Sequence, residues 1–480
     1  MKQLSALDAS FLHLESPRTP MHIGSLNIYD QSSAEGGKVT FKGILAMIEE
    51  RLHLARSFRE RAVNVPLALD YPYWIQDPDF DLEFHVRHIA LPAPGDWRQL
   101  CIQVARLHSR PLDLARPLWE FTVIEGLDNV PGIPAGAYAL ASKVHHAAID
   151  GVSGAEMTVA IHDLEPGAVP PGPERVWRSE PVPQPVELLA RASWNNVRQP
   201  LRFPKLLAST VPALRQLQGP GIELPTRVGD VPKTRFDAKV SPHRVFEGRT
   251  FALDDMKRIK GAVDGATIND VVLTICGGAI RRYLASHDEL PEASLVAMAP
   301  VSVRTDDERG AAGNQVSTMS VALRTDIVHP LERLAAVHET SQSAKELTNA
   351  VGARLLTDYT QFMPSVTMAM ASRLYSRLSD RIVPFNCVVT NVPGPQFPLY
   401  SAGAEMVATF GYGPIVDGLG LFMPVLSYNG QVTISATSCR EMMPDPEHFS
   451  QCIQDTFDEL LEAVAPKPKK KRATKKTAKK

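Results

Sequence analysis

His145 and His146 lie shortly before Asp150 and Gly151, in the run His-His-Ala-Ala-Ile-Asp-Gly. An imidazole is the natural general base near neutral pH because its unperturbed pKa is about 6.5. Such a base can take the proton from a hydroxyl so that the oxygen attacks an activated acyl carbon. The spacing from His146 to Asp150 lets the carboxylate lie beside the imidazole or anchor the loop elsewhere. The motif therefore indicates base-catalysed transfer to a hydroxyl group.

Three other interpretations compete with this one. Most single histidines in globular proteins have a structural role, and the pattern alone does not exclude that role here. Zinc binding is disfavoured because adjacent histidines on an extended segment point to opposite sides, and the sequence offers no evident third ligand cluster. A serine hydrolase is disfavoured because residues 151–154, Gly-Val-Ser-Gly, are one residue short of the G-x-S-x-G nucleophile elbow.

The motif is expected at the junction of a strand and a helix. The mostly apolar run Tyr138–Val144 predicts a buried strand that delivers the chain to the two histidines. Ser153 is a suitable cap for a following helix, and Gly151 lies between the two elements, where a sharp turn favours positive φ. Such a junction can expose one side chain to a cleft while its neighbour packs inside.

The length of 480 residues predicts two domains rather than one. Prolines crowd residues 166–185, where no regular element can persist. We therefore expect a mixed α/β domain at 1–165, a Pro-rich and helical connection at 166–240, a second α/β domain at 241–465 and a disordered polybasic tail at 466–480.

Apolar runs and helical spacing predict the individual elements. Strands are expected at residues 121–124, 136–141, 250–253, 295–303, 318–323, 387–390 and 432–436. Helices are expected at residues 44–54, 99–108 and 267–285, and one or two amphipathic helices within 186–218. Thr267 is a good N-cap for the helix that follows it.

Composition indicates a soluble globular protein, with 44% hydrophobic and 22% charged residues. No apolar run reaches the roughly 18–20 residues that span a bilayer, and Asp8 and Glu15 interrupt the place of a signal-peptide core. We therefore expect a cytoplasmic protein. The five cysteines lack the C-x-x-C spacing of metal or redox sites, and their odd number argues against a disulfide framework.

The net charge of −2 hides a strong asymmetry. Residues 467–480 contain nine of the 51 basic residues and no acidic one, which leaves 42 basic against 53 acidic residues in the body. A basic cluster is attracted to an anionic membrane by about 1 kcal/mol per charge. The tail lacks a large apolar side chain, so it would attract electrostatically rather than anchor, unless it only keeps the protein soluble. Binding of nucleic acid through it would be nonspecific.

Motifs spread over most of the chain resemble those of one protein family. They are Leu7-Asp8-Ala9-Ser10-Phe11, Pro20-Met21-His22-Ile23-Gly24, Arg116-Pro117-Leu118-Trp119-Glu120, the HHxxxDG motif at 145–151, Asn269-Asp270, Pro300-Val301-Ser302-Val303-Arg304 and Thr390-Asn391-Val392-Pro393-Gly394-Pro395. In this order they resemble the bacterial wax ester synthase/diacylglycerol acyltransferase family of the chloramphenicol-acetyltransferase-like superfamily. Thr390 departs from the serine that the family has more often, and the exchange keeps a hydroxyl.

The resemblance implies an α/β fold of two chloramphenicol-acetyltransferase-like domains, with the active site in a channel between them. It implies transfer of a long-chain fatty acyl group from acyl-CoA to a fatty alcohol, which gives a wax ester, or to diacylglycerol, which gives triacylglycerol. Neither a covalent intermediate nor a metal nor a cofactor is required. The sequence does not rank the two acceptors.

Roles for individual residues follow from the same resemblance. His146 would be the general base, His145 would support the shape of the site, and Asp150 would orient the loop with Gly151. In the wider superfamily the aspartate pairs with a distant arginine, for which Arg304 is the candidate here, although it can equally be a surface charge.

Attack on a thioester creates an oxyanion that needs a hydrogen-bond donor nearby. The candidates for this or for substrate positioning are Asn269, Asp270, Thr390 and Asn391. Each has a local alternative, since Asn269 begins a helix and Asn391 precedes a turn. Trp119 would pack under the site or line the acyl channel, and simple core packing is the expected role.

Apolar substrates imply that the protein meets a membrane or a lipid inclusion peripherally. A non-catalytic lipid-inclusion protein with the same fold remains an alternative, although loss of His146 or Asp150 would be expected in it. Another alternative is a superfamily acyltransferase with a different acceptor, such as an amine. The motifs after the histidines argue against it because they resemble the wax ester synthase branch.

Overall fold

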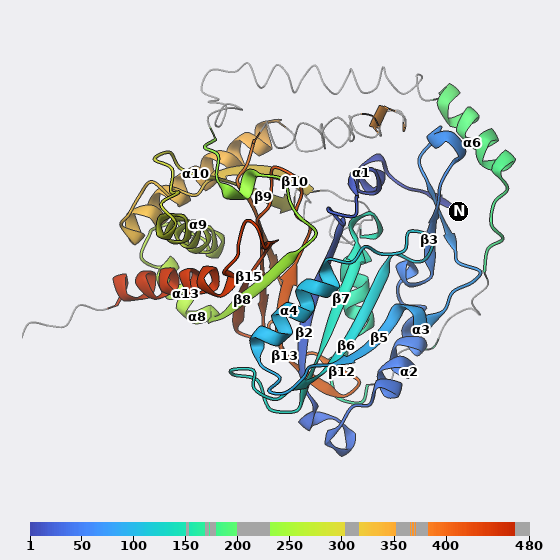
Figure 1. Cartoon of the computed structure of the whole chain (residues 1–480), viewed down its shortest axis with the longest axis horizontal. Coiled ribbons are helices and arrows are strands. Elements are labelled where there is room, and N and C mark those ends of the chain that lie inside the picture. The colour runs from blue at the N-terminus through green and yellow to red at the C-terminus, as the bar shows by residue number, and fades with distance from the viewer. Residues whose placement is uncertain are drawn as a thin grey trace, which may run out of the picture.

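A computed structural model of the chain describes residues 1–149, 153–168, 172, 179–198, 231–302, 316–351, 365, 367–368, 370 and 383–465. Asp150, Gly151 and Arg304, the tail at 466–480 and most of the connection at 166–240 lie outside the described residues. The predictions made for them stay predictions. The described part contains two six-stranded sheets and one small sheet (Figure 1).

The first large sheet carries the histidine motif. Its strand order is β12-β13-β2-β7-β6-β5, and β5 pairs with β6 in parallel while the other neighbours are antiparallel. The strands are β2 (His22–Asp30), β5 (Val86–Ala90), β6 (Trp119–Leu127), β7 (Ala137–His145), β12 (Tyr400–Ser401) and β13 (Ala404–Tyr412). Helices pack on both faces of this sheet, namely α2 (Phe41–Arg51), α3 (Leu82–His85), α4 (Trp97–His108) and α5 (Ser153–Ala160).

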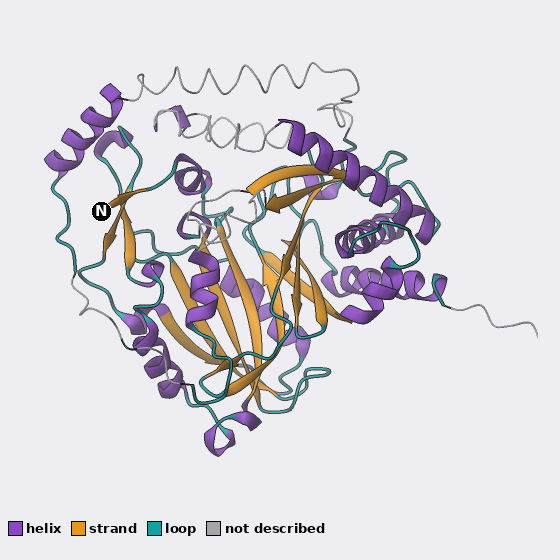
Figure 2. Ribbon diagram, turned by 180° about the vertical axis from the view of Figure 1, so that it is seen from behind, coloured by secondary structure: helices purple, strands orange, loops and turns teal. Residues whose placement is uncertain are grey.

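The second large sheet has the order β10-β9-β11-β14-β15-β8. Its strands are β8 (Arg244–Ala252), β9 (Val296–Ser302), β10 (Val316–Ala322), β11 (Cys387–Pro393), β14 (Phe422–Tyr428) and β15 (Gln431–Cys439). Its helices are α8 (Leu253–Lys260), α9 (Ile268–Ser286), α10 (Pro330–Val351) and α13 (Pro446–Ala463). The helices gather beside this sheet in both ribbon views (Figures 1 and 2), and they share with it the largest apolar core.

A small antiparallel sheet lies at the N-terminal end of the molecule. It consists of β1 (Lys2–Gln3), β4 (Tyr73–Gln76) and β3 (Glu60–Val63), and it lies next to α1 (Ala6–Leu14) and α6 (Pro185–Arg198) (Figure 1). Short 3-10 turns complete the described elements, namely η1 (Gln31–Ser33), η2 (Glu35–Gly37), η3 (Arg56–Phe58), η4 (Pro66–Ala68), η5 (His146–Ala148) and η7 (Arg235–Asp237).

The C-terminal half of the chain completes the first sheet. β13 pairs with β2 over most of its length and places Tyr412 opposite Gly24. Glycine is needed at position 24 because a Cβ there would lie 2.3 Å from the Tyr412 ring and 2.0 Å from the carbonyl oxygen of Ser142. β13 also touches the second sheet, where Thr433 donates to the carbonyl oxygen of Thr409. The first sheet therefore contains strands from both halves of the chain, and no single position in the sequence separates the residues of the two sheets.

Most of the predicted helices and strands are present in the structure, and several are longer than predicted. The strand predicted over Tyr138–Val144 is β7, which ends at His145, and the strands predicted near 121–124 and 432–436 are the middles of β6 and β15. The helix predicted at 99–108 is α4. Strands β1 to β5 and β12 to β14 were not predicted from the sequence. The five cysteines are free and buried, as expected.

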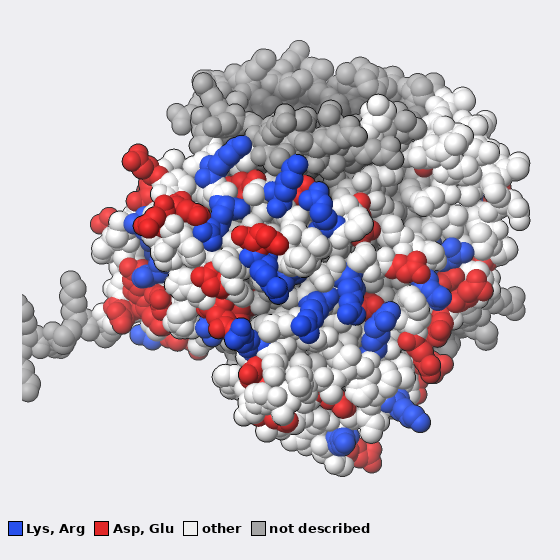
Figure 3. Space-filling model, in the orientation of Figure 1, with Lys and Arg blue, Asp and Glu red and all other residues white. Residues whose placement is uncertain are grey.

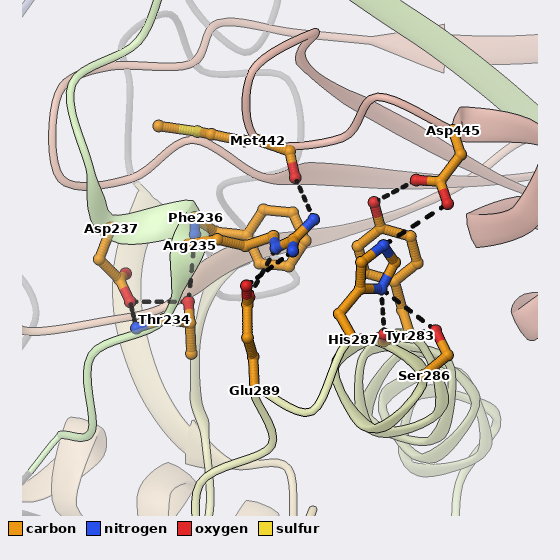
Figure 4. A network of polar contacts seen from close by, with 10 residues as sticks. All are labelled: Thr234, Arg235, Phe236, Asp237, Tyr283, Ser286, His287, Glu289, Met442 and Asp445. Carbon is orange, nitrogen blue, oxygen red and sulfur yellow. Dashed lines mark hydrogen bonds and ion pairs between the residues drawn. The ribbon is translucent and has the colours of Figure 1, made fainter.

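The helix predicted after Thr267 is α9, and it begins as expected. The Thr267 side chain accepts from the backbone N–H of Asp270, while the Asp270 carboxylate accepts from the backbone N–H of Thr267, which is a complete capping box. At the other end of α9, Tyr283 donates to Asp445, which comes just before α13 (Figure 4). α9 is thus fixed at both ends.

The chain enters the second half through a polar network (Figure 4). Arg235 forms a bidentate pair with Glu289, with Nε 2.6 Å from one oxygen and Nη2 2.7 Å from the other. Two residues on, Asp237 accepts from Thr234 and from the amide of Asn386. Burial raises the pKa of Asp237 to about 6. These contacts tie residues 234–237 to the segment after α9 and to the residue before β11.

Lysine and arginine side chains gather in the middle of the face shown in Figure 3, over α4 and β8, with acidic side chains between them. In the part of the chain that the structure describes, no helix combines the length and the apolar character needed to cross a bilayer.

Candidate active site

The backbone of three segments fixes the two histidines at the end of β7. His22 of β2 lies opposite His145 in the antiparallel register. The N–H of His145 donates to the carbonyl oxygen of Leu118 at 2.9 Å, and the N–H of His146 donates to that of Met21 at 2.8 Å. The Pro-Leu-Trp and Pro-Met-His motifs therefore hold the end of β7 through main-chain hydrogen bonds.

His145 is fully buried, and both of its ring nitrogens have partners. Nε2 lies 3.2 Å from Oε2 of Glu15, a residue 130 positions earlier in the chain. Nδ1 accepts from the backbone N–H of Ala147 at 3.0 Å. A ring held on both sides suits the supporting role expected for His145.

His146 is the first residue of η5 and is half-buried. The ring of Phe11 stacks on its imidazole with the centroids 4.0 Å apart and the planes 17° from parallel. Burial, with a smaller effect of His145, lowers the pKa of His146 to about 4, so the imidazole is neutral at physiological pH. Nδ1 is buried and has no hydrogen-bond partner among the described residues. A neutral imidazole carries a lone pair on one ring nitrogen and is a competent proton acceptor.

Two further histidines lie buried beside the motif. His22 Nε2 donates to the carbonyl oxygen of His108 at 2.7 Å, and His108 Nε2 donates to that of Gly413 at 2.9 Å. Burial lowers the pKa of His22 well below its usual value and that of His108 to about 3. These rings tie β2, α4 and the end of β13 together, and neither was singled out from the sequence.

Trp119 packs in the core of the first domain and is 1% exposed. Its Nε1 donates to the carbonyl oxygen of Phe58 at 2.9 Å, and its ring stacks on His85 with centroids 4.6 Å apart. It lies opposite Val144, the residue before the motif. These contacts are those of simple core packing, the role expected for Trp119.

The two asparagine candidates meet in the second half of the chain. The amide of Asn391 donates to Oδ1 of Asn269 at 3.3 Å, which joins β11 to the first turn of α9. Both side chains are half-buried, as is Thr390, which lies opposite Pro424 in the parallel pair of β11 with β14. The Asn269 and Asn391 motifs, far apart in sequence, thus meet at one place.

Asp270 makes the contacts of a helix cap. Its Oδ2 accepts from the backbone and the hydroxyl of Thr267 and from Nδ1 of His338 of α10, at 2.8, 2.9 and 2.9 Å. The residue is fully buried. These bonds fix the first turn of α9, and with it the backbone that carries Asn269.

Asp150 and Gly151 of the motif and the partner candidate Arg304 lie outside the described residues. The described residues include no group of three or more His, Cys, Asp or Glu side chains that is arranged to hold a metal ion.

Sequence reasoning missed Glu15 and the role of Phe11. Phe11 belongs to the N-terminal motif, but nothing in a single sequence indicates that it contacts His146. The available signal is the spacing of four residues from Phe11 to Glu15, which places the two side chains one helical turn apart at the end of α1.

The chain matches two family descriptions over most of its length. Residues 4–272 match the wax ester synthase/diacylglycerol acyltransferase catalytic domain, and residues 312–461 match the WS/DGAT C-terminal domain. A protein of Mycobacterium tuberculosis strain H37Rv that bears the name "putative diacylglycerol O-acyltransferase" is 34% identical over 474 residues, or 98% of this chain and 92% of the relative.

Two solved structures are similar over nearly the whole chain. The wax ester synthase/diacylglycerol acyltransferase from Marinobacter aquaeolei VT8 has a TM-score of 0.67 and 28% identity, covering 96% of this chain and 100% of that one. The first condensation domain of the calcium-dependent antibiotic synthetase has a TM-score of 0.56 and 12% identity, covering 97% and 96%. The second likeness is one of fold alone.

Proposed function

This chain belongs to the wax ester synthase/diacylglycerol acyltransferase family and is an acyltransferase, and we propose that His146 is the base of its reaction. The substrates proposed are a long-chain acyl-CoA as donor and a fatty alcohol or diacylglycerol as acceptor. The observation that carries the proposal is the neutral, Phe11-covered imidazole at the end of β7. Its low pKa keeps the lone pair available throughout the physiological pH range.

The reaction needs one proton acceptor and no covalent intermediate. The acceptor hydroxyl attacks the thioester carbonyl carbon while His146 takes its proton, and the carbonyl electrons move onto oxygen. The tetrahedral intermediate then collapses, the C–S bond breaks, and the imidazolium returns the proton to the CoA thiolate. The products are an ester and free CoA. A buried imidazolium is costly, which favours rapid return of the proton.

Stabilisation of the oxyanion is proposed for the asparagine pair. A preorganised amide donor at a developing oxyanion lowers the barrier by about 3–4 kcal/mol. Asn391 has a second amide hydrogen beyond the one given to Asn269, and the pair lies at the N-terminal turn of α9, where the helix dipole favours negative charge. Thr390, the neighbour of Asn391 in sequence, is still proposed as a substrate-positioning residue.

The acyl-CoA donor and the lipid acceptor are proposed to meet different parts of the protein. Arg98 and Arg106 of α4 are exposed and are a complement for the phosphates of acyl-CoA. The lipid acceptor comes from a membrane or a lipid inclusion, which the protein would meet peripherally. The basic segment 467–480 is the proposed electrostatic contact with that surface.

A substrate panel tests the proposal. CoA release and ester formation are measured with palmitoyl-CoA and either 1-hexadecanol or a diacylglycerol, for the wild type and for His146→Ala. We expect ester formation by the wild type and a loss of about 10²–10⁴-fold in kcat for the variant. His243→Ala, which removes an exposed histidine, is the matched control and keeps full activity.

Three outcomes of this panel, extended by an amine acceptor, would contradict the proposal. Near-full activity of a folded His146→Ala variant would exclude His146 as the base. A wild type that transfers palmitate to an amine but to neither alcohol would instead assign another acceptor. A wild type that binds the lipids without turnover would identify a lipid-binding protein that keeps only the fold.

A further inference from the structure

Glu15 contacts the end of β7, which carries the histidine motif, and the residue just before β2. One carboxylate oxygen, Oε2, lies 3.2 Å from Nε2 of His145. The other, Oε1, accepts from the backbone N–H of Met21 at 3.4 Å, and the carbonyl oxygen of Met21 accepts from the N–H of His146. The Glu15 side chain is 7% exposed. A carboxylate this deeply buried is rare unless hydrogen bonds use it.

The hydrogen bonds of His145 fix its tautomer. Nδ1 faces the backbone N–H of Ala147, which can only donate, so Nδ1 must carry the lone pair. The ring proton of the neutral imidazole therefore lies on Nε2 and points at Glu15. The other tautomer would set two hydrogens against each other at Nδ1 and a lone pair against the carboxylate at Nε2.

We propose that Glu15 is a positioning residue for acyl transfer, because it accepts the Nε2–H of His145, whose tautomer the Ala147 N–H sets, and thereby fixes the turn that presents His146. The proposal rests on the proposed role of His146 as the base. Glu15 does not touch the reacting atoms in it. It acts through His145 on one side and through Met21 on the other.

The path from Glu15 to His146 is short on both sides. Ala147 follows His146 in η5, and its N–H is held by His145 Nδ1. The N–H of His146 itself is held by Met21, whose own N–H is held by Glu15. The backbone is thus fixed immediately before and after the Cα of His146. A displacement of about 1 Å in such a group can cost about 100-fold in rate.

The same helix also supplies the ring that covers His146. Glu15 is the C-cap of α1, and its N–H donates to the carbonyl oxygen of Phe11 one turn earlier. α1 therefore presents a carboxylate to one histidine and a phenyl ring to the other. This explains why a helix 130 residues before the motif packs directly on η5.

Three substitutions at position 15 separate the hydrogen bond from charge and volume. Glu15→Gln keeps an oxygen that can accept from His145 Nε2–H, whereas Glu15→Met has similar volume and no such oxygen. Glu15→Ala removes both. We expect Glu15→Met and Glu15→Ala to lose about 10- to 100-fold in kcat with KM for acyl-CoA changed by less than about twofold, and Glu15→Gln to stay within about threefold. Glu35→Ala, which removes an exposed carboxylate, is the control.

The Nε2–H proton of His145 gives a second readout that does not depend on turnover. In protein labelled with 15N-histidine, the His145 signals, assigned by their absence in His145→Asn, are expected to show a protonated, hydrogen-bonded Nε2 in the wild type and in Glu15→Gln. In folded Glu15→Met, where Ala147 still donates to Nδ1, the tautomer is expected to stay and the Nε2–H signal to lose its hydrogen-bonded chemical shift. Equal kcat values for the Gln and Met variants, or an unchanged His145 Nε2–H signal in the Met variant, would overturn the proposal. If His146→Ala is active, the base assignment fails, and the Nε2–H readout still decides the Glu15–His145 relationship.

Discussion

The phenyl ring of Phe11 lies flat on the imidazole of His146, with ring centroids 4.0 Å apart. This contact covers one face of the proposed base with an apolar surface. Water that would solvate an imidazolium on that side is excluded, and burial is the largest cause of the low pKa of His146. The N-terminal helix therefore influences the protonation state of a residue 135 positions later in the chain.

Removing Phe11 is expected to change the pH dependence of the reaction. The base must be neutral, so activity falls as the pH drops through its pKa, which lies at about 4 in the wild type. In Phe11→Ala the imidazole is solvated, and its pKa should rise toward the ordinary value of about 6.5. The acid limb of kcat/KM against pH is expected to move upward in the same direction. Phe397→Ala, at an exposed phenylalanine, should leave the profile unchanged.

Loss of the Asn391 amide is expected to slow the chemical step. If Asn391 stabilises the oxyanion, Asn391→Ala should lower kcat by about 10²–10³-fold while KM for acyl-CoA changes little. The measurement is steady-state CoA release with palmitoyl-CoA and a saturating alcohol. Asn129→Ala, at an exposed asparagine in an isolated β-bridge, is the comparison. A drop in acyl-CoA affinity with unchanged kcat would assign Asn391 to substrate binding instead.

Asp270→Ala is expected to destabilise the second half of the protein. The substitution leaves the N–H of Thr267 and Nδ1 of His338 without their acceptor, at a residue that is fully buried. The free energy of unfolding should fall by about 1–3 kcal/mol, measured by urea denaturation. Asp264→Ala, an exposed aspartate in the preceding turn, is expected to cost much less. Equal stability of the two variants would argue against the capping role.

Acid is expected to destabilise the fold through its buried histidines. Burial lowers the folded-state pKa of His108 to about 3, that of His162 to about 4, and that of His22 well below 6.5. Below pH 6.5 the unfolded chain binds protons that the folded protein does not, so stability is full above 6.5 and is lost as the pH falls toward 4. Each group contributes up to about 1.4 kcal/mol per pH unit in this window. Melting temperatures between pH 8 and pH 4 check this, and a flat profile would contradict it.

Deleting residues 467–480 is expected to weaken binding to anionic vesicles. The deletion removes nine positive charges and leaves a body with a formal net charge of −11, obtained from 42 basic and 53 acidic residues. The fraction of protein that co-sediments with phosphatidylserine-containing vesicles should fall. The fall should be larger at low salt, because at high salt screening weakens the attraction of the intact tail as well. Activity in a detergent assay should stay near that of the wild type. Unchanged vesicle binding would exclude the tail as the contact.

The sequence predicted local features better than long-range contacts. The strand that ends at His145 and the cap at Thr267 were predicted because apolar runs and capping residues act within a few positions. The pairing of β13 with β2 was not predicted, because no local signal specifies a partner strand across most of the chain. The contact of Glu15 with His145 was missed for the same reason, although each residue lies in a recognisable element.

The pairing of Gly24 in β2 with Tyr412 in β13 has a consequence for synthesis of the protein. Until the ribosome has released β13, β2 presents its unpaired N–H and C=O groups as an open sheet edge, which another chain can pair with. A polypeptide that stops before residue 404 keeps this edge permanently. The fold thus distinguishes complete chains from truncated ones, because only a complete chain covers its own aggregation-prone edge.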